Sequence, residues 1–215
     1  MREVRLVNSK SVDYTLYLVT DRDLLKGKSL IETVEEAIKG GVTLVQLREK
    51  DVTSLEFYNI AKEVKKVTDK YNVPLIINDR LDIALAIDAE GLHIGQSDLP
   101  CKVAREILPK GKILGVSAHT LEEALKAQEE GADYVGCGAM FSTSTKKDAS
   151  NVSFESLKKI KDSLEIPVVA IGGINENNIS KLSGTGIDGV AIVSAIIGKE
   201  SSREAAEMLK KIFLK

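Results

Sequence analysis

The chain has 215 residues, of which 43% are hydrophobic and 29% charged, with a formal net charge of −2 at pH 7; this length can bury one sizeable core. The near balance of charge excludes a bulk field that recruits nucleic acid or an anionic membrane, and the absence of tryptophan argues against a base-stacking platform. No run approaches the roughly 20 apolar residues of a membrane span, and Cys101 and Cys137 lack metal-site or redox spacing, so a cytoplasmic protein is expected.

Eight short apolar runs follow one another along the chain, as is typical of parallel strands that are buried on both faces. We interpret as strands Leu16–Thr20, Thr43–Leu47, Leu75–Asn78, Gly91–Ile94, Ile113–Ser117, Tyr134–Gly138, Val168–Ile171 and Gly189–Val193. Several of them begin in a weak internal repeat, which reads G-G-V-T-L-V, E-G-L-H-I, E-G-A-D-Y-V and T-G-I-D-G-V.

Amphipathic segments with helical spacing lie between these runs, most clearly Ser29–Lys39, Ser54–Tyr71, Thr120–Glu130 and Ser153–Leu164. Ser29 and Thr120 each precede a glutamate by three residues, which predicts a capping box. No linker interrupts the alternation, so we predict one α/β domain over residues 1–215, a TIM (β/α)₈ barrel with residues 1–14 as an N-terminal extension. A doubly wound open sheet is the structural alternative.

Polar or glycine-rich clusters follow nearly every strand, which favours the closed barrel because its loops converge on one face. Asp79 and Asp98 follow neighbouring strands and as a pair suit Mg²⁺, although each alone is better explained as a helix cap (Asp79) or a turn residue (Asp98). Gln46, Arg48 and Lys50 alternate at the end of the second strand, so all three are expected to point into the barrel mouth, where Arg48 and Lys50 can bind phosphate; an exposed charged loop is the alternative.

Two further clusters suit phosphate groups. Thr143–Lys146 follows the sixth strand with three hydroxyls and a lysine, but lacks the order of a P-loop. Gly172, Gly173 and Ser194 follow the last two strands, between which barrels often bind phosphate. Ser117 belongs to no hydrolase motif, and His93 within a strand is interpreted as a core histidine.

The strings Q-L-R-E-K, I-N-D-R, H-I-G-Q-S-D-L-P, G-V-S-A-H, T-S-T-K-K-D-A, V-A-I-G-G-I and A-I-V-S resemble those of the thiamine-phosphate synthase (thiamine-phosphate pyrophosphorylase) family. The resemblance runs from about Leu16 to Ser194. It implies a TIM-barrel transferase of thiamine biosynthesis that joins 4-amino-2-methyl-5-(diphosphooxymethyl)pyrimidine to a (carboxy)thiazole phosphate and releases diphosphate. It also implies one Mg²⁺ per subunit.

The resemblance also implies residue roles. The residues that match the family's pyrimidine-diphosphate site are Gln46, Leu47, Arg48, Glu49, Lys50, Asn78, Ser117 and Lys146. The residues that match its thiazole-phosphate contacts are Thr143, Ser144, Thr145, Gly173, Val193 and Ser194. Asp79 and Asp98 match its Mg²⁺ ligands. The implied mechanism ionises the pyrimidine CH₂–O bond before the thiazole nitrogen attacks the cation. Catalytic roles are then expected for Arg48, Lys50, Ser117 and Lys146.

The chain departs from the family where G-P-I-[FY]-P-T is usual, because Ala139 and Ser142 replace both prolines. Proline restricts the backbone, so we expect a looser loop with an effect on thiazole affinity rather than on the reaction class.

Three other functions stay open. They are a paralogue that aromatises the thiazole, a Schiff-base aldolase that uses Lys50 or Lys146, and a non-catalytic sensor of phosphorylated ligands. Retention of Arg48, Lys50, Asp79, Asp98 and Lys146 favours the synthase. The expected partners are two phosphorylated small molecules, and the sequence does not decide between a monomer and a homo-oligomer.

Overall fold

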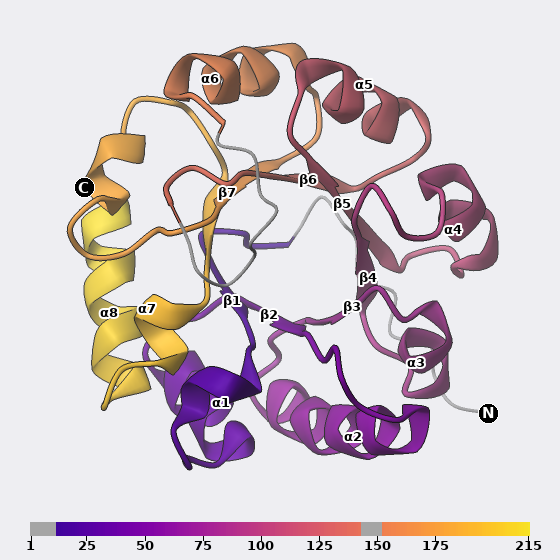
Figure 1. The fold of residues 1–215 in the computed structure, drawn as a ribbon, viewed down its shortest axis with the longest axis vertical. Coiled ribbons are helices and arrows are strands. Elements are labelled where there is room, and N and C mark those ends of the chain that lie inside the picture. The colour runs from indigo at the N-terminus through magenta and orange to yellow at the C-terminus, as the bar shows by residue number, and fades with distance from the viewer. Residues whose placement is uncertain (1–11, 143–151) are drawn as a thin grey trace.

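The computed structural model describes residues 12–142 and 152–215, in which parallel strands form a closed barrel. Each strand pairs with the next along the chain, and β8 pairs with β1 (Figure 1). The strands are β1 (Leu16–Val19), β2 (Leu44–Leu47), β3 (Leu75–Asn78), β4 (Gly91–Ile94), β5 (Ile113–Ala118), β6 (Tyr134–Cys137), β7 (Val168–Ile171) and β8 (Gly189–Ile192). Every predicted strand is present, and the closure confirms the TIM barrel over the open doubly wound sheet.

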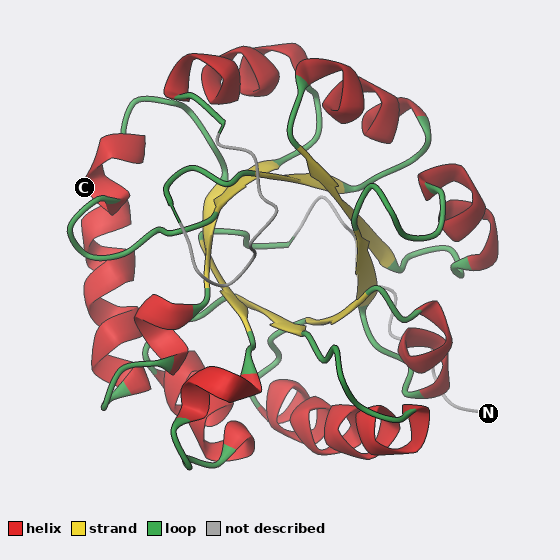
Figure 2. Cartoon of the chain, viewed as in Figure 1, coloured by secondary structure: helices red, strands yellow, loops and turns green. Residues whose placement is uncertain are grey.

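Helices surround the barrel on the outside (Figure 2). They are α1 (Leu30–Lys39), α2 (Ser54–Lys70), α3 (Leu81–Ala86), α4 (Cys101–Ile107), α5 (Leu121–Glu129), α6 (Phe154–Ser163), α7 (Ser194–Ile197) and α8 (Ser202–Phe213). After β7 the crossover is a 3₁₀ turn, Ile179–Leu182, rather than an α-helix. Within residues 12–142 and 152–215, none of these helices combines the length and the hydropathy that crossing a membrane requires.

The two predicted helix caps form, although one capping box differs from its expected pattern. Ser29 and Thr120 accept hydrogen bonds from the backbone N–H groups of Glu32 and Glu123. The carboxylate of Glu123 reaches the backbone N–H of His119, one residue before the cap, at 2.6 Å. This contact fixes the end of β5, where it enters the loop that leads to α5.

Two apolar layers bury the barrel strands from both sides. Alternate strand residues such as Leu18 and Val45 pack outward against the helices. The others, such as Tyr17 and Tyr134, fill the barrel interior. Tyr14 closes the interior below them, with its ring centroid 5.0 Å from that of Tyr134. Residues 1–11 of the predicted N-terminal extension lie outside the described residues.

The residue directly before each even-numbered strand ties that strand to its predecessor at the N-terminal rim of the barrel. These residues are Thr43, Glu90, Asp133 and Asp188, which accept hydrogen bonds from the backbone N–H groups of Leu16, Leu75, Leu114 and Val168. The three acids also pair with helix cations, namely Lys65, Arg105 and Lys161. The weak sequence repeat therefore corresponds to a unit of two strands and two helices.

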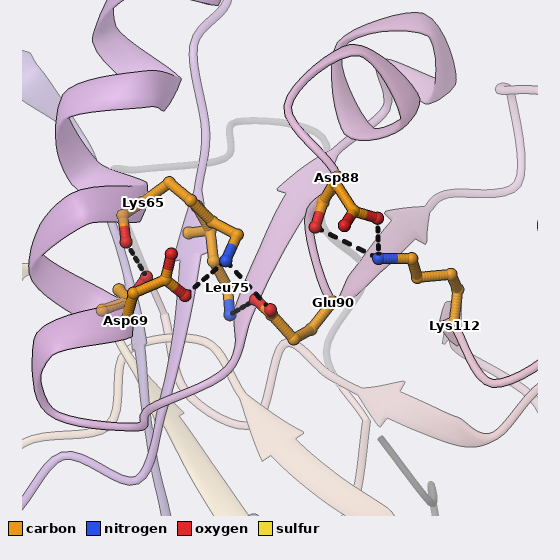
Figure 3. Close-up of polar contacts among 7 residues, drawn as sticks. Lys65, Asp69, Leu75, Asp88, Glu90 and Lys112 are labelled. Atoms are coloured by element: carbon orange, nitrogen blue, oxygen red, sulfur yellow. Dashed lines mark hydrogen bonds and ion pairs between the residues drawn. The ribbon is translucent and has the colours of Figure 1, made fainter. Parts of the chain in front are cut away.

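Figure 3 shows the part of this rim around β3, β4 and β5. The carboxylate of Glu90 accepts from the Leu75 N–H at 2.9 Å and pairs with Lys65 at 3.0 Å. Beside it, Lys112 donates to the backbone carbonyl of Asp88 at 3.1 Å and also pairs with the carboxylate of Asp88. Buried charges are tolerated here because the surrounding chain supplies each with a hydrogen-bonded partner.

Candidate active site

A cavity of about 460 Å³ opens at the C-terminal ends of the strands and is lined by residues from all eight of them. The predicted site residues that line it are Gln46, Arg48, Lys50, Asn78, Asp79, Asp98, Ser117, Gly173, Val193 and Ser194. Four further predicted residues, Thr143, Ser144, Thr145 and Lys146, lie outside the described residues. The structure thus gathers strand-end groups that are far apart in sequence into one mouth, as the barrel prediction requires.

Two residues of the Q-L-R-E-K string are not part of the cavity lining. Leu47 is fully buried in the outer core, and the Glu49 carboxylate lies 2.7 Å from the Arg22 guanidinium. The reason is the two-residue period of a strand, which directs Gln46, Arg48 and Lys50 inward and the residues between them outward. Glu49 therefore fastens the end of β2 to the turn after β1 and does not present its side chain to a ligand in this cavity.

In that position the Glu49 carboxylate is buried and only partly hydrogen-bonded. Its side chain is 4% exposed, and its Oε1 atom has no hydrogen-bond partner among the described residues. Burial raises the pKa of Glu49 above its usual value, although Arg22 opposes the shift.

Asp79 and Asp98 lie close together at the ends of β3 and β4. Asp79 adopts a left-handed backbone conformation, with φ of 60°, and its N–H donates to the carbonyl of His93 at 2.8 Å. The Asp98 carboxylate accepts from the N–H of Gly95 at 2.7 Å. Burial and, after it, the hydrogen-bonded carboxylate of Asp98 together raise the pKa of Asp79 to about 6, against the opposing charge of Lys50. The like charge of Asp98 thus disfavours ionisation of Asp79.

This pair fits the chemistry of a Mg²⁺ site. Within the described residues, no group of three or more histidine, cysteine or acidic side chains could enclose a metal ion. Mg²⁺ does not require such a cage, since it commonly takes one or two carboxylates and completes its shell with water and substrate phosphate oxygens. A divalent cation would also relieve the repulsion that raises the pKa of Asp79.

Cations stand beside this acidic pair. Lys50 Nζ is 4.0 Å from Asp79 Oδ2, and Arg48 Nη1 is 3.9 Å from Asp21 Oδ2. The backbone N–H of Arg48 donates to the Thr20 hydroxyl at 3.0 Å, which fixes the point where this side chain leaves β2. Long, partly exposed ion pairs of this kind are weak, so both cations can exchange their acid partners for a phosphate at little cost.

The ends of β7 and β8 form a second part of the mouth. Gly172 and Gly173 have φ angles of 102° and 65°, and a Cβ atom on Gly173 would lie 2.6 Å from the carbonyl oxygen of Ser142. Only glycine therefore fits this turn without displacing the chain. Val193 and Ser194, at the start of α7, line the cavity as well. Backbone N–H groups at such a turn can approach an anion closely.

Three residues of the cavity floor escaped the site prediction, namely Tyr17, His93 and Tyr134. His93 is a buried core histidine, as interpreted, but it also lines the cavity and its Nε2 lies 2.9 Å from the Ser117 hydroxyl. Strand alternation was the available signal, because each residue has the inward parity of its strand. His119 lines the cavity too, with Nδ1 3.3 Å from Glu123 Oε2.

A closed parallel barrel whose C-terminal mouth combines paired acids, cations and glycine turns has the architecture of a TIM-barrel enzyme. Comparison with known proteins identifies the family to which this barrel belongs. The family model described as thiamine monophosphate synthase matches residues 16–196. Thiamine-phosphate synthase of Clostridium tetani is 62% identical over 96% of this chain and 99% of its own, and that of Alkaliphilus oremlandii is 62% identical over 93% and 96%.

A solved structure agrees with these relatives. The thiamine phosphate pyrophosphorylase from Pyrococcus furiosus has a TM-score of 0.88 and 44% identity, covering 94% of this chain and 96% of that one. The chain therefore belongs to the thiamine monophosphate synthase family. It is an enzyme of the transferase class in thiamine biosynthesis, with thiamine-phosphate synthase activity.

Proposed function

We propose that this enzyme, in the cytoplasm, condenses 4-amino-2-methyl-5-(diphosphooxymethyl)pyrimidine with a (carboxy)thiazole phosphate to give thiamine phosphate and diphosphate. The observation that carries the proposal is that one cavity is lined both by a group of cations and acids and by a glycine turn from other strands. The first group comprises Arg48, Lys50, Asp79 and Asp98. The second comprises Gly173, Val193 and Ser194, and would hold the thiazole phosphate.

Asp79 and Asp98 would hold one Mg²⁺ together with the diphosphate. When bound, this ion supplies positive charge that stabilises the departing diphosphate. Arg48 can grip phosphate oxygens in a bidentate manner, and Lys50 adds a mobile point charge beside Asp79. The Ser117 hydroxyl and Lys146 belong to the same proposed group, although Lys146 lies outside the described residues.

The proposed reaction is a dissociative substitution at the pyrimidine methylene carbon. The CH₂–O bond breaks first and its electron pair leaves with the diphosphate, so that the pyrimidine becomes a stabilised cation. The thiazole nitrogen then donates its lone pair to the methylene carbon. This step requires no strong base; it requires stabilised leaving-group charge and two rings held together in a cavity with little water.

The test incubates the pure protein with both phosphorylated heterocycles, with and without Mg²⁺, and measures thiamine phosphate and diphosphate. We expect equal amounts of both products and a strong dependence on Mg²⁺. A thiazole-aromatising paralogue would release no diphosphate, and a sensor would bind without turnover. The aldolase has less support at Lys50, because that side chain is 54% exposed and beside Asp79, whereas a Schiff-base lysine is typically desolvated or next to another cation.

A further inference from the structure

A continuous chain of hydrogen bonds crosses the barrel under the cavity. Gln46 Nε2 donates to the Tyr17 hydroxyl at 2.7 Å, and the Tyr17 and Tyr134 hydroxyls are 2.8 Å apart. The Tyr134 hydroxyl lies 2.9 Å from His93 Nδ1, and His93 Nε2 lies 2.9 Å from Ser117 Oγ. The two ends, Gln46 on β2 and Ser117 on β5, both line the cavity. We call these five residues the floor chain.

The floor chain is buried except at Ser117, which is half-buried, and its phenols stay protonated. Tyr17 and Tyr134 are at most 1% exposed, and burial raises the pKa of each hydroxyl above its usual value. Gly115 makes room for the Tyr134 ring, because a Cβ atom at that position would lie 2.1 Å from the ring. The two phenols are therefore neutral groups in fixed positions, and each hydroxyl has a single hydrogen to donate.

The direction of one hydrogen bond then determines the direction of the others. Because the Gln46 amide donates to Tyr17, the arrangement that uses every hydroxyl hydrogen has Tyr17 donating to Tyr134. Tyr134 in turn donates to His93 Nδ1, and the neutral imidazole donates from Nε2 to the oxygen of Ser117. In this arrangement Ser117 keeps its hydrogen for a ligand acceptor, and Gln46 keeps its carbonyl oxygen for a ligand donor.

The opposite arrangement is also self-consistent. Ser117 would donate to His93, the bonds through Tyr134 and Tyr17 would reverse, and the Gln46 amide would rotate to accept from Tyr17. The cavity would then face a Gln46 NH₂ group at one end and a serine oxygen with no hydrogen to donate at the other. The two ends of the floor chain therefore switch together.

We propose that the floor chain couples recognition of an anion at Ser117 to recognition of an amino group at Gln46. An anion that accepts from the Ser117 hydroxyl selects the first arrangement, which turns the Gln46 carbonyl oxygen toward the cavity. Tyr17, Tyr134 and His93 are then positioning residues that transmit hydrogen-bond direction between β2 and β5. This inference rests on the proposed function, in which one substrate carries both an amino group and a diphosphate.

The test measures binding of two separate probes by calorimetric titration. One is 4-amino-5-hydroxymethyl-2-methylpyrimidine, which has the amine but no charge, and the other is inorganic diphosphate with Mg²⁺. We expect saturating diphosphate to tighten pyrimidine binding about fivefold or more, and pyrimidine to tighten diphosphate binding by the same factor. An analogue with a carbonyl oxygen in place of the amine should show a factor of one or below.

The decisive variant is Tyr134→Phe, which cuts the floor chain in its middle but leaves Gln46 and Ser117 in place. We expect each probe alone to bind within about threefold of wild type, while the coupling factor falls to about one. Tyr17→Phe cuts the chain at a second point and should do the same. Tyr14→Phe is the matched control, because it removes a neighbouring buried hydroxyl outside the floor chain and should keep the coupling.

The outcomes distinguish the two proposals. Coupling that survives in both Tyr134→Phe and Tyr17→Phe, or its absence in wild-type protein that binds both probes, overturns the floor-chain inference alone. Failure of the wild-type protein to bind either probe contradicts the proposed function and the inference that rests on it. A merely structural role for Tyr134 would weaken each probe alone and leave the coupling factor unchanged, which also counts against transmission.

Discussion

The two rims of the barrel use the same kinds of side chains in opposite ways. At the N-terminal rim, Glu90 accepts from a strand N–H and pairs with a cation (Figure 3), and Asp133 and Asp188 do the same. At the C-terminal rim, Asp79 faces a second acid, and Lys50 lies 4.0 Å from it without a closer acid contact in the described residues. One rim thus satisfies its charges internally, and the other leaves them available.

This contrast separates stability from function within one fold. A charge with internal partners contributes to holding strands in register, and its loss affects the folded state. A charge that faces a like charge destabilises the folded state until a ligand arrives. We therefore expect variants at the N-terminal rim to lose stability with little change in turnover, and variants at the C-terminal rim to lose turnover without losing stability.

The largest effect is expected for Asp98→Ala, which removes one proposed Mg²⁺ ligand. Turnover should fall about a thousandfold, since a group that stabilises charge in the transition state typically contributes that much. Far-UV circular dichroism should stay native, because the Asp98 carboxylate accepts from the N–H of Gly95 within its own turn and ties no distant segments of the backbone together in the described residues. Steady-state release of diphosphate measures the loss, and activity near the wild-type level would contradict the metal assignment.

The next effect is expected at the opposite rim, for Glu90→Ala. This change leaves the Leu75 N–H and one side of Lys65 without their acceptor in a buried place, which should lower the free energy of unfolding by about 3 kcal/mol. Urea denaturation measures it. Glu90→Gln is the matched control, because it keeps an acceptor for the N–H and should lose about half as much. Below its melting temperature, either variant should turn over within about twofold of the wild-type rate. A larger loss would contradict the expectation that the N-terminal rim affects stability and not turnover.

A smaller effect of opposite sign is expected for Asp79→Asn without divalent cations. The pKa of Asp79 in the folded protein is about 6, above the ordinary value of 3.8, so the folded state binds the proton more tightly than the unfolded state. Below about pH 4, Asp79 therefore does not lower the free energy of unfolding. As the pH rises through 6, its ionisation lowers this free energy increasingly. Asparagine tolerates the left-handed conformation, so the variant should gain about 1 to 2 kcal/mol at pH 7, discounted for partial exposure.

Denaturant titrations of Asp79→Asn at pH 7 and pH 4 check both the size and the sign of this gain. The gain should disappear at the lower pH, where wild-type Asp79 is protonated. A gain of equal size at both pH values would mean that backbone conformation rather than charge is responsible. Turnover of the variant should be lost at either pH, which links the gain in stability to the proposed function of this rim.

The sequence predicted the C-terminal rim from the strand ends, and the physical reason is local. Short apolar runs mark buried parallel strands, and the residues after them must lie at one face once the barrel closes. Alternation then placed Gln46, Arg48 and Lys50 correctly at the cavity. The same alternation directs the side chains of Leu47 and Glu49 away from the cavity. The match of the whole Q-L-R-E-K string to the substrate site did not take this alternation into account.

What the sequence could not predict depends on contacts between distant segments. The Tyr17 and Tyr134 hydroxyls meet across 117 residues of chain, and neither residue stands in a recognisable motif. The raised pKa of Asp79 depends on burial and on Asp98 approaching it from the next strand end. Such pairings follow from barrel diameter and register rather than from local spacing.

The smallest effect is expected between the two rims, at Tyr14. Its hydroxyl is buried without a hydrogen-bond partner among the described residues, while its ring packs 5.0 Å from that of Tyr134. Removing an unsatisfied buried polar group relieves its desolvation cost and keeps the ring contact, so Tyr14→Phe should change the free energy of unfolding by less than about 0.5 kcal/mol or raise it. Urea denaturation measures this change, with Tyr17→Phe as the variant for comparison. Tyr17→Phe should be the less stable of the two, because it loses the hydrogen bonds to Gln46 and Tyr134. A clear destabilisation by Tyr14→Phe would mean that this hydroxyl is bonded in solution, and that the interior below the floor chain is more polar than its apolar surroundings indicate.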